Sequence, residues 1–176
     1  MAAKWTAFVS GDVLTAAQLN DTVDNFADTA IFNEQQASNT NGGGFTSGSY
    51  VKRVLNTTIV NNITGCSIAS SVITLPAGTY NVIANAPAFS VNAHRARLQN
   101  TTASTTIALG MNAFTNQTVT DGVTNSTVNT IFTLSATSTI ELQHRCETTR
   151  TVNGLGTLCN FGDNEVYAQI QITRIG

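Results

Sequence analysis

From residue 45 to residue 176 the chain repeats one pattern, short stretches rich in β-branched residues that turn residues interrupt every ~8–12 positions. The clearest stretch has Val166, Ala168, Ile170 and Ile172 alternating with Tyr167 and polar residues. A period of two places one set of side chains inward, so we expect this strand to lie centrally in a sheet. The predicted strands cover residues 51–60, 66–74, 78–86, 93–100, 105–111, 127–135, 139–145 and 165–175.

Strands that follow one another without helices pair antiparallel, because parallel neighbours need long crossover connections. The composition agrees, since charged residues make up only 10% of the chain and Thr, Asn, Ser and Gln supply its polarity. These observations predict an all-β fold, an antiparallel β-sandwich of the jelly-roll type. A turn is expected at Pro76 and Gly78, between two strands.

The first 36 residues show a different pattern. Thr15 and Gln18 match a capping box, and apolar residues then recur three or four positions apart, which predicts a helix over residues 15–36. We therefore expect an attachment segment at 1–36 with one helix, a flexible Gly/Asn/Ser linker at 37–49 and a head domain at 50–176. The residues expected to attach or pack this segment are Trp5, Leu14, Leu19, Val23, Phe26 and Ala30.

The charge excludes some classes of protein. The net charge is -2, whereas a nucleic-acid binder usually carries a basic face. No apolar run is long enough to span a bilayer, and the N-terminus lacks the features of a signal peptide, so we expect synthesis and assembly in the cytoplasm. Three cysteines without a Cys-x-x-Cys pair indicate buried thiols, with a Cys146–Cys159 disulfide as the alternative.

No residue pattern indicates catalysis or a cofactor. Strand alternation places His94 on the face opposite Arg95, and His144 on the face opposite Glu141 and Arg145. No Gly-x-Ser-x-Gly element is present, and the two histidines lie far apart in the sequence without a metal-ligand spacing. We expect no enzymatic activity, no metal and no cofactor, and we interpret the histidines as structural polar contacts.

Two stretches resemble a known family. The string LPAGTY at 75–80, with HRARLQNTT at 94–102, and the run from ELQHRC at 141–146 to EVYAQI at 165–170, resemble phage tail-fibre or receptor-binding heads of the trimeric jelly-roll type. That architecture is similar to tumour necrosis factor and complement globular heads. Residues 9–20 resemble the segments by which phage fibres attach to a virion.

The resemblance implies a homotrimeric head, a place on a virion and a docking partner among the phage structural proteins of tail or capsid. We expect a short fibre whose head projects outward, with binding of a host-surface glycan or receptor as an extension of that role. The alternatives are a capsid decoration or head-fibre protein without receptor binding and a secreted lectin-like signalling head. A capsular depolymerase is the remote third.

Two groups of residues are candidate sites. Arginines near an oligomer axis need acidic partners, so we expect an intersubunit polar network in a trimer. Long ordered loops often carry binding residues, which makes the segments at 112–127 and 146–163 candidate recognition loops. The network residues are Arg95, Arg97, Glu141, Arg145 and Glu165, and the loop residues are Asn112, Asn116, Asp121, Asn153 and Asn160.

Overall fold

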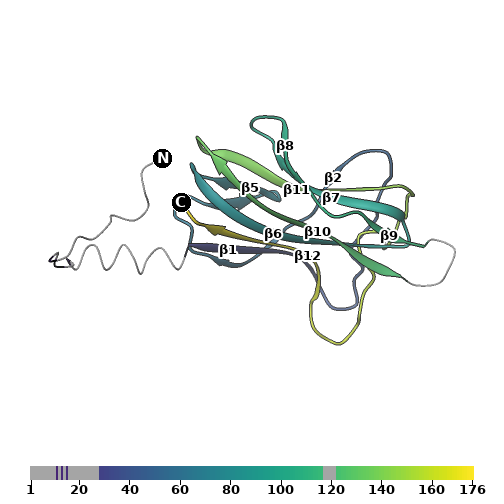
Figure 1. Ribbon diagram of the computed structural model, residues 1–176. Helices are drawn as coiled ribbons and strands as arrows, with labels where there is room; N and C mark the ends of the chain where they lie inside the picture. Colours follow the sequence, from purple (N-terminus) through teal and green to yellow (C-terminus); the bar gives the residue numbers. More distant parts are fainter. Residues whose placement is uncertain (1–10, 12, 14, 16–27, 117–121) are drawn as a thin grey trace.

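The computed structural model describes Gly11, Val13, Thr15, residues 28–116 and residues 122–176. Within these residues the chain is an antiparallel β-sandwich of two sheets without helices (Figure 1), which confirms the predicted fold class. The strands are β1 Thr29–Gln36, β2 Val51–Lys52, β3 Thr57–Asn61, β4 Ser67–Ala69, β5 Val72–Leu75, β6 Gly78–Phe89, β7 Asn92–Asn100, β8 Thr105–Leu109, β9 Ala113–Thr115, β10 Val123–Leu134, β11 Ser138–Cys146 and β12 Glu165–Arg174.

One sheet has the strand order β10-β6-β12-β1-β3, and we call it the five-stranded sheet. The other, the seven-stranded sheet, has the order β4-β5-β11-β7-β8, with β2 added to β11 and β9 added to β7. Strand β12 lies between β6 and β1, so the prediction of a central last strand is confirmed. The start of β1 and the C-terminus lie at the same end of the sandwich (Figure 1), where the Arg174 amide donates to the Asp28 carbonyl at 2.9 Å.

Two of the predicted strands are each divided into two in the structure, and the stretch 51–60 contains β2 and β3, which belong to different sheets. The stretch 66–74 is a tight hairpin of β4 and β5, because Ser70 and Ser71 adopt left-handed backbone angles, φ 49° and 61°, that reverse the chain. The turn around Pro76 does connect two strands, but it leads from β5 in the seven-stranded sheet to β6 in the five-stranded sheet. The Tyr80 hydroxyl donates to the Pro76 carbonyl at 2.8 Å and holds this crossing.

The prediction that a helix continues to Gln36 is wrong, because residues 29–36 form β1, paired with both β12 and β3. Ala30 and Phe32 are fully buried in the core, so Ala30 belongs to the head. Of the predicted helical stripe, Ala30 is the member within the described residues, and from Thr29 to Phe32 fully buried side chains alternate with part-buried ones. The other residues predicted for attachment, Trp5, Leu14, Leu19, Val23 and Phe26, lie outside the described residues.

The segment 37–49 is part of the head and not a flexible linker. The Gly42 amide donates to the Gly156 carbonyl at 3.0 Å, and the buried Phe45 exchanges backbone hydrogen bonds with Arg150. A Cβ atom at Gly44 would lie 2.6 Å from the Thr151 carbonyl oxygen. The glycines therefore let two backbones approach closely.

A β-bulge changes the predicted inward set of β12. Asn33 pairs with Gln169 but Gln35 pairs with Val166, so two residues of β12 face one residue of β1. As a result Tyr167 and Ala168 are both buried, while Val166 is 50% exposed. The alternation of the sequence holds from Ala168 onward.

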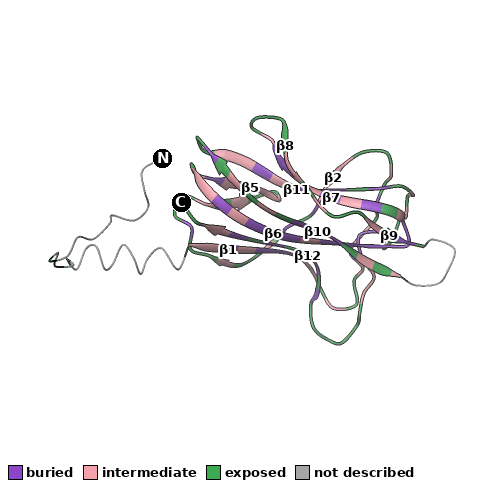
Figure 2. Ribbon diagram, in the orientation of Figure 1, coloured by how far each residue is buried: buried purple, intermediate pink, exposed green. Residues whose placement is uncertain are grey.

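The core consists of two apolar clusters, and Figure 2 shows how buried and exposed residues are distributed along the strands. The larger cluster fills the sandwich toward the end with the C-terminus and contains Phe32, Tyr80, Leu98, Leu142 and Ile172, among others. The smaller cluster lies toward the opposite end, and its members are Phe45, Ala88, Val91, Cys146 and Leu155.

A chain of buried polar side chains separates the two clusters. On β11, His144 comes between Leu142 of the larger cluster and Cys146 of the smaller one. Arg53, fully buried, donates from Nε to Glu34 Oε2 at 2.6 Å and from Nη1 and Nη2 to two backbone carbonyls. Because a buried guanidinium needs all its donors satisfied, these contacts connect β1, β6 and the 147–156 loop.

The two histidines extend this polar chain back to the five-stranded sheet. Arg53 Nη1 lies 3.4 Å from His144 Nδ1, His144 Nε2 lies 2.9 Å from His94 Nδ1, and His94 Nε2 lies 2.8 Å from Thr124 Oγ1. The two histidines, far apart in the sequence, therefore meet in the fold, because β7 and β11 are neighbours. The interpretation as structural polar contacts fits their burial, 4% exposed for His94 and 0% for His144.

The proton on each ring follows from Arg53. A guanidinium only donates, so His144 Nδ1 accepts and its proton is on Nε2. His144 Nε2 then donates to His94 Nδ1, which places the His94 proton on Nε2, where it donates to Thr124. A second proton on either ring would set two N–H donors against each other.

Burial and charge both disfavour such protonation. Burial, and then the Arg53 charge, lower the pKa of His94 from 6.5 to about 4. Burial, Arg53 and His94 together lower the pKa of His144 well below 6.5. Burial raises the pKa of the Glu34 carboxyl, and the Arg53 guanidinium opposes that shift.

The three cysteines are free thiols, so the alternative of a Cys146–Cys159 disulfide is wrong. Cys146 is buried in the smaller cluster, whereas Cys159 is exposed. Burial raises the pKa of the Cys146 thiol to about 11, which keeps it protonated at neutral pH.

We expect the head to lose stability as the pH falls from about 6.5 toward about 4. A histidine whose pKa is lower in the folded state is neutral there while the unfolded chain binds a proton, so unfolding becomes easier in acid. At about 1.4 kcal/mol per pKa unit, each histidine should lower the free energy of unfolding by about 2 kcal/mol between about pH 7 and about pH 5, which is about 4 kcal/mol for the pair. Chemical denaturation at the two pH values measures this.

The matched control is the double variant His94→Gln, His144→Gln. It loses the hydrogen-bonded pair and is less stable at neutral pH, but it has no imidazole to protonate. Its stability should change much less across the same pH interval. Equal losses in the variant and in the natural chain would contradict the assignment.

Candidate functional site

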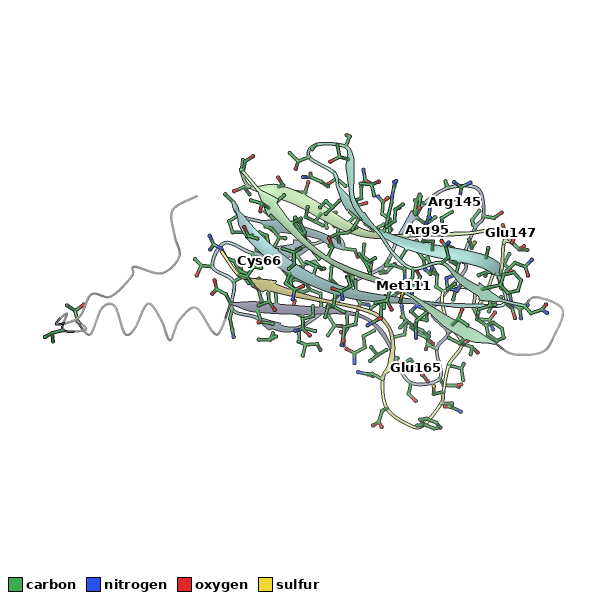
Figure 3. All side chains as sticks on the ribbon, in the orientation of Figure 1. Cys66, Arg95, Met111, Arg145, Glu147 and Glu165 are labelled. Carbon is green, nitrogen blue, oxygen red and sulfur yellow. The ribbon has the colours of Figure 1, made fainter. Side chains whose placement is uncertain are left out.

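A broad groove of about 830 Å³ lies on the exterior of the seven-stranded sheet, away from the C-terminus and the start of β1 (Figure 3). Four parts of the chain form it: the 47–50 segment, the start of β7, the 112–114 segment and the end of β11. Strand alternation places the odd-numbered residues of β7 and β11 outward, into this groove, while the histidines point inward. The residues that line the groove include Tyr50, Arg95, Asn112, Phe114, Arg145 and Glu147.

Arg95 and Arg145 are directly opposite each other on the paired strands β7 and β11. Figure 3 shows both at the end of the sandwich where Glu147 also lies. Like charges in this position repel each other. Among the described residues Arg95 has one side-chain partner, Asn112 Oδ1 at 3.3 Å, and Arg145 has none. The pair is therefore poorly compensated within the described part of the chain.

The acid in the groove does not neutralise the arginines. Glu147 Oε2 accepts a hydrogen bond from the Ala93 amide at 3.1 Å. The described salt bridges join Lys52 to Glu141 and Arg53 to Glu34. Two guanidiniums against one carboxylate leave this part of the surface positive.

The remaining residues of the predicted polar network make contacts within the chain. Arg97 donates to Gln143 Oε1 at 2.8 Å, and its guanidinium carbon lies 3.9 Å from the centre of the Tyr50 ring. Glu141 accepts from Gln143 Nε2 at 2.7 Å and pairs with Lys52 at 3.7 Å. These residues share the outer face of the seven-stranded sheet with Arg95 and Arg145.

Glu165 lies apart from the other four (Figure 3), at the start of β12 in the five-stranded sheet. Its carboxylate accepts hydrogen bonds from the Cys159 and Asn160 amides at 2.9 and 2.8 Å. These bonds lower the pKa of Glu165 and close the loop before β12. The structure thus brings four of the five residues onto one face, and an intersubunit role for them stays a prediction.

The predicted recognition residues do not form one site. Asn112 lines the groove, and Asn116 follows β9 nearby. Asn153 accepts from Arg150 Nε at 3.0 Å within the 147–156 loop, and Asn160 is exposed beside Glu165. Asp121 lies outside the described residues.

Sequence reasoning missed the aromatic residues of the groove. Phe114 is 59% exposed and Tyr50 is half-buried under Arg97. Nothing in the sequence indicates this exposure, because large apolar side chains are usually expected to face the core. The pairing of β9 with β7, which brings Phe114 to the arginines, has no mark in the sequence.

The exterior of the five-stranded sheet has the opposite character. Strands β3, β6 and β10 contain no charged residue. The charged residues of β1 and β12 are buried or lie at strand ends. One cross-strand row runs from Asn129 through Ile83, Gln171 and Ile31 to Val60. Within this row Ile83 is 40% exposed, and next to the row Ile131 is 64% exposed, so aliphatic and neutral polar groups alternate over this face.

The described residues contain neither a cluster of metal ligands nor a membrane-spanning helix. No group of three or more His, Cys, Asp or Glu side chains converges there as metal ligands do. Nor does the described part of the chain contain a helix with the length and apolar character that crossing a membrane requires.

Comparison with known proteins relates the chain through its fold. No family model and no curated protein sequence matches it. The Eiger TNF of S. frugiperda is similar with a TM-score of 0.56 and 12% identity, over 84% of this chain and 92% of that one. The vertex protein P5 of PRD1 gives a TM-score of 0.55 and 11% identity, over 85% and 98%.

A third similar structure is the globular domain of zebrafish complement 1qA, with a TM-score of 0.52 and 12% identity over 84% of this chain and 95% of that one. At these identities the likeness concerns the fold alone. The chain therefore has the two-sheet jelly-roll fold of tumour necrosis factor and complement 1q heads, which a vertex protein shares.

Proposed function

We propose that the chain is a structural protein of a phage virion, a short fibre whose N-terminal segment attaches to the particle and whose homotrimeric head projects outward. The observation that carries the proposal is the uncharged, partly aliphatic exterior of the five-stranded sheet. The resemblance of residues 75–102 and 141–170 to phage fibre heads supports the same role.

The uncharged face suits a second and third copy of the chain. Interfaces between subunits are depleted in charged residues at their centre, because a charge buried without a partner is costly. Ile31, Ile83 and Ile131 offer apolar area there, and Asn and Gln can hydrogen-bond across the contact. Threefold packing through this sheet would leave the seven-stranded sheet exposed.

The start of β1 and the C-terminus lie away from the groove, which supports a projecting head. The start of β1 and the C-terminus lie at one end of the head (Figure 1), and the groove residues Arg95, Arg145 and Glu147 lie toward the other (Figure 3). If the head is attached to the particle through its N-terminal segment, the groove lies on the outer part of the head. Three attachment segments in one trimer would also bind more strongly than one.

A shell decoration protein without a receptor is the second candidate. The structural similarity to a protein named for a vertex supports a place on the shell as much as a place on a tail. A secreted signalling head shares the fold too, but the fibre-like sequence strings favour the virion role.

We expect the protein in solution to have three times the 18.5 kDa mass of the chain. Ile131→Glu should weaken the trimer by at least about 100-fold, because each interface would bury an unpaired carboxylate. Analytical ultracentrifugation over a concentration series measures the mass. The matched control is Leu109→Glu, since Leu109 is 53% exposed but lies on β8 of the other sheet.

Circular dichroism checks that both variants fold. A natural chain that stays a folded monomer at every concentration would contradict trimerisation. Dissociation by Leu109→Glu, with an intact trimer for Ile131→Glu, would place the interface on the other sheet.

The virion role is tested with particles. A chain that lacks residues 1–27 keeps every described strand, so we expect it to remain a trimeric head but to be absent from purified particles. Labelling with an antibody against the head, followed by electron microscopy, shows whether the full chain is on tails or on capsids. Particles that carry the truncated chain as well as the full one would contradict attachment through the N-terminal segment.

A further inference from the structure

We infer that the groove on the seven-stranded sheet binds the acidic group of an anionic saccharide, with Arg95 and Arg145 as its direct contacts. The inference rests on the proposed function, since a projecting head presents this groove outward, and it names the class of ligand.

The groove has an excess of positive charge from Arg95 and Arg145. Two guanidiniums on opposed positions of paired strands repel each other unless an anion lies between them. The described part of the chain supplies no such anion, because Glu147 is held at the Ala93 amide and Glu141 at Lys52. Guanidinium groups bind carboxylate and phosphate oxygens in a two-pronged manner, so the pair is suited to one oxyanion.

The walls of the groove carry aromatic and neutral polar side chains that suit a sugar. Phe114 presents an exposed ring at one wall, and the Tyr50 ring is held in place by Arg97 at another. Flat rings pack against the apolar C–H faces of a sugar, while Asn112 and Ser47 offer neutral hydrogen-bonding groups for hydroxyls. Apolar walls with a few polar contacts are typical of small-molecule sites.

The groove has too few positive charges to bind a polyanion. Nucleic acids need many phosphate contacts, whereas this groove has two arginines and one glutamate on a chain of net charge -2. A single acidic group on an otherwise neutral ligand matches that balance. A uronic acid supplies it as a carboxylate and a sugar phosphate supplies it as a phosphate.

The test uses the full chain in its trimeric form and isothermal titration calorimetry. The probes are glucuronic acid, glucose 6-phosphate and glucuronamide, the uncharged counterpart of the first. We expect at least one acidic sugar to bind saturably and at least about tenfold more tightly than glucuronamide. Which acidic sugar binds tells carboxylate from phosphate recognition.

Arg145→Gln should weaken the acidic sugar by at least about tenfold, and Phe114→Ala should weaken it as well. The matched control is Lys52→Gln, which removes the same charge from the same sheet outside the groove and should change the affinity less than about twofold. Absence of binding for both acidic sugars, equal binding of glucuronamide, or an equal loss in Lys52→Gln would overturn the inference.

These variants lie on the sheet opposite the proposed trimer face, so each should keep the mass of the natural protein. A groove that binds no acidic sugar on an intact trimer would refute this inference alone. A monomeric protein would instead refute the proposed assembly.

Discussion

The buried guanidinium of Arg53 is the contact on which the arrangement of the head depends. It joins Glu34 of the five-stranded sheet to His144 of the seven-stranded sheet, and His94 and Thr124 return the chain of hydrogen bonds to the first sheet. Such a chain is costly to bury unless every member is satisfied, and it then fixes one arrangement of the strands. Among its described atoms, Glu34 Oε1 is the one without a partner.

This inner contact also determines the outer surface. His94 and Arg95 are neighbours on β7, and His144 and Arg145 are neighbours on β11, so the strands that turn histidines inward turn arginines outward. The hydrogen bond between the two rings fixes how β7 lies on β11, which sets the two guanidiniums opposite each other. The groove therefore depends on a register that is held from inside the core.

The two exteriors of the sandwich divide the charge between them. The seven-stranded sheet carries Arg95, Arg97, Arg145, Lys52 and Glu141, while the central face of the five-stranded sheet is neutral. In the proposed trimer the neutral face is buried among copies, and the charged one meets the solvent. Charge sorting of this kind separates assembly from recognition within one small domain.

Much of this fold could be predicted from the sequence, and the reasons for the failures are physical. The alternation in β12 predicted a central strand, because alternate burial follows from the pleat alone. The bulge at Tyr167 and the strand at Thr29–Gln36 depend on partners far along the chain, which local spacing does not reveal. The glycines at 42–44 predicted flexibility, whereas they allow close packing on the 147–156 loop.

The site was predictable in part. Alternation placed Arg95 and Arg145 on the face opposite the histidines, but only strand pairing shows that the arginines oppose each other and that the rings meet. Nothing near Arg53 in the sequence indicates a fully buried base, since its partners come from four separate segments.

The most direct test of the Arg53 chain is the protonation state of its two rings, measured by nitrogen NMR of the imidazoles at neutral pH. The account predicts that His94 and His144 are both neutral, with the proton on Nε2 and a bare Nδ1 that accepts a hydrogen bond. A proton on Nδ1 of His144, or a charged ring at either position, would contradict the contact with Arg53 and with it the register that sets the groove.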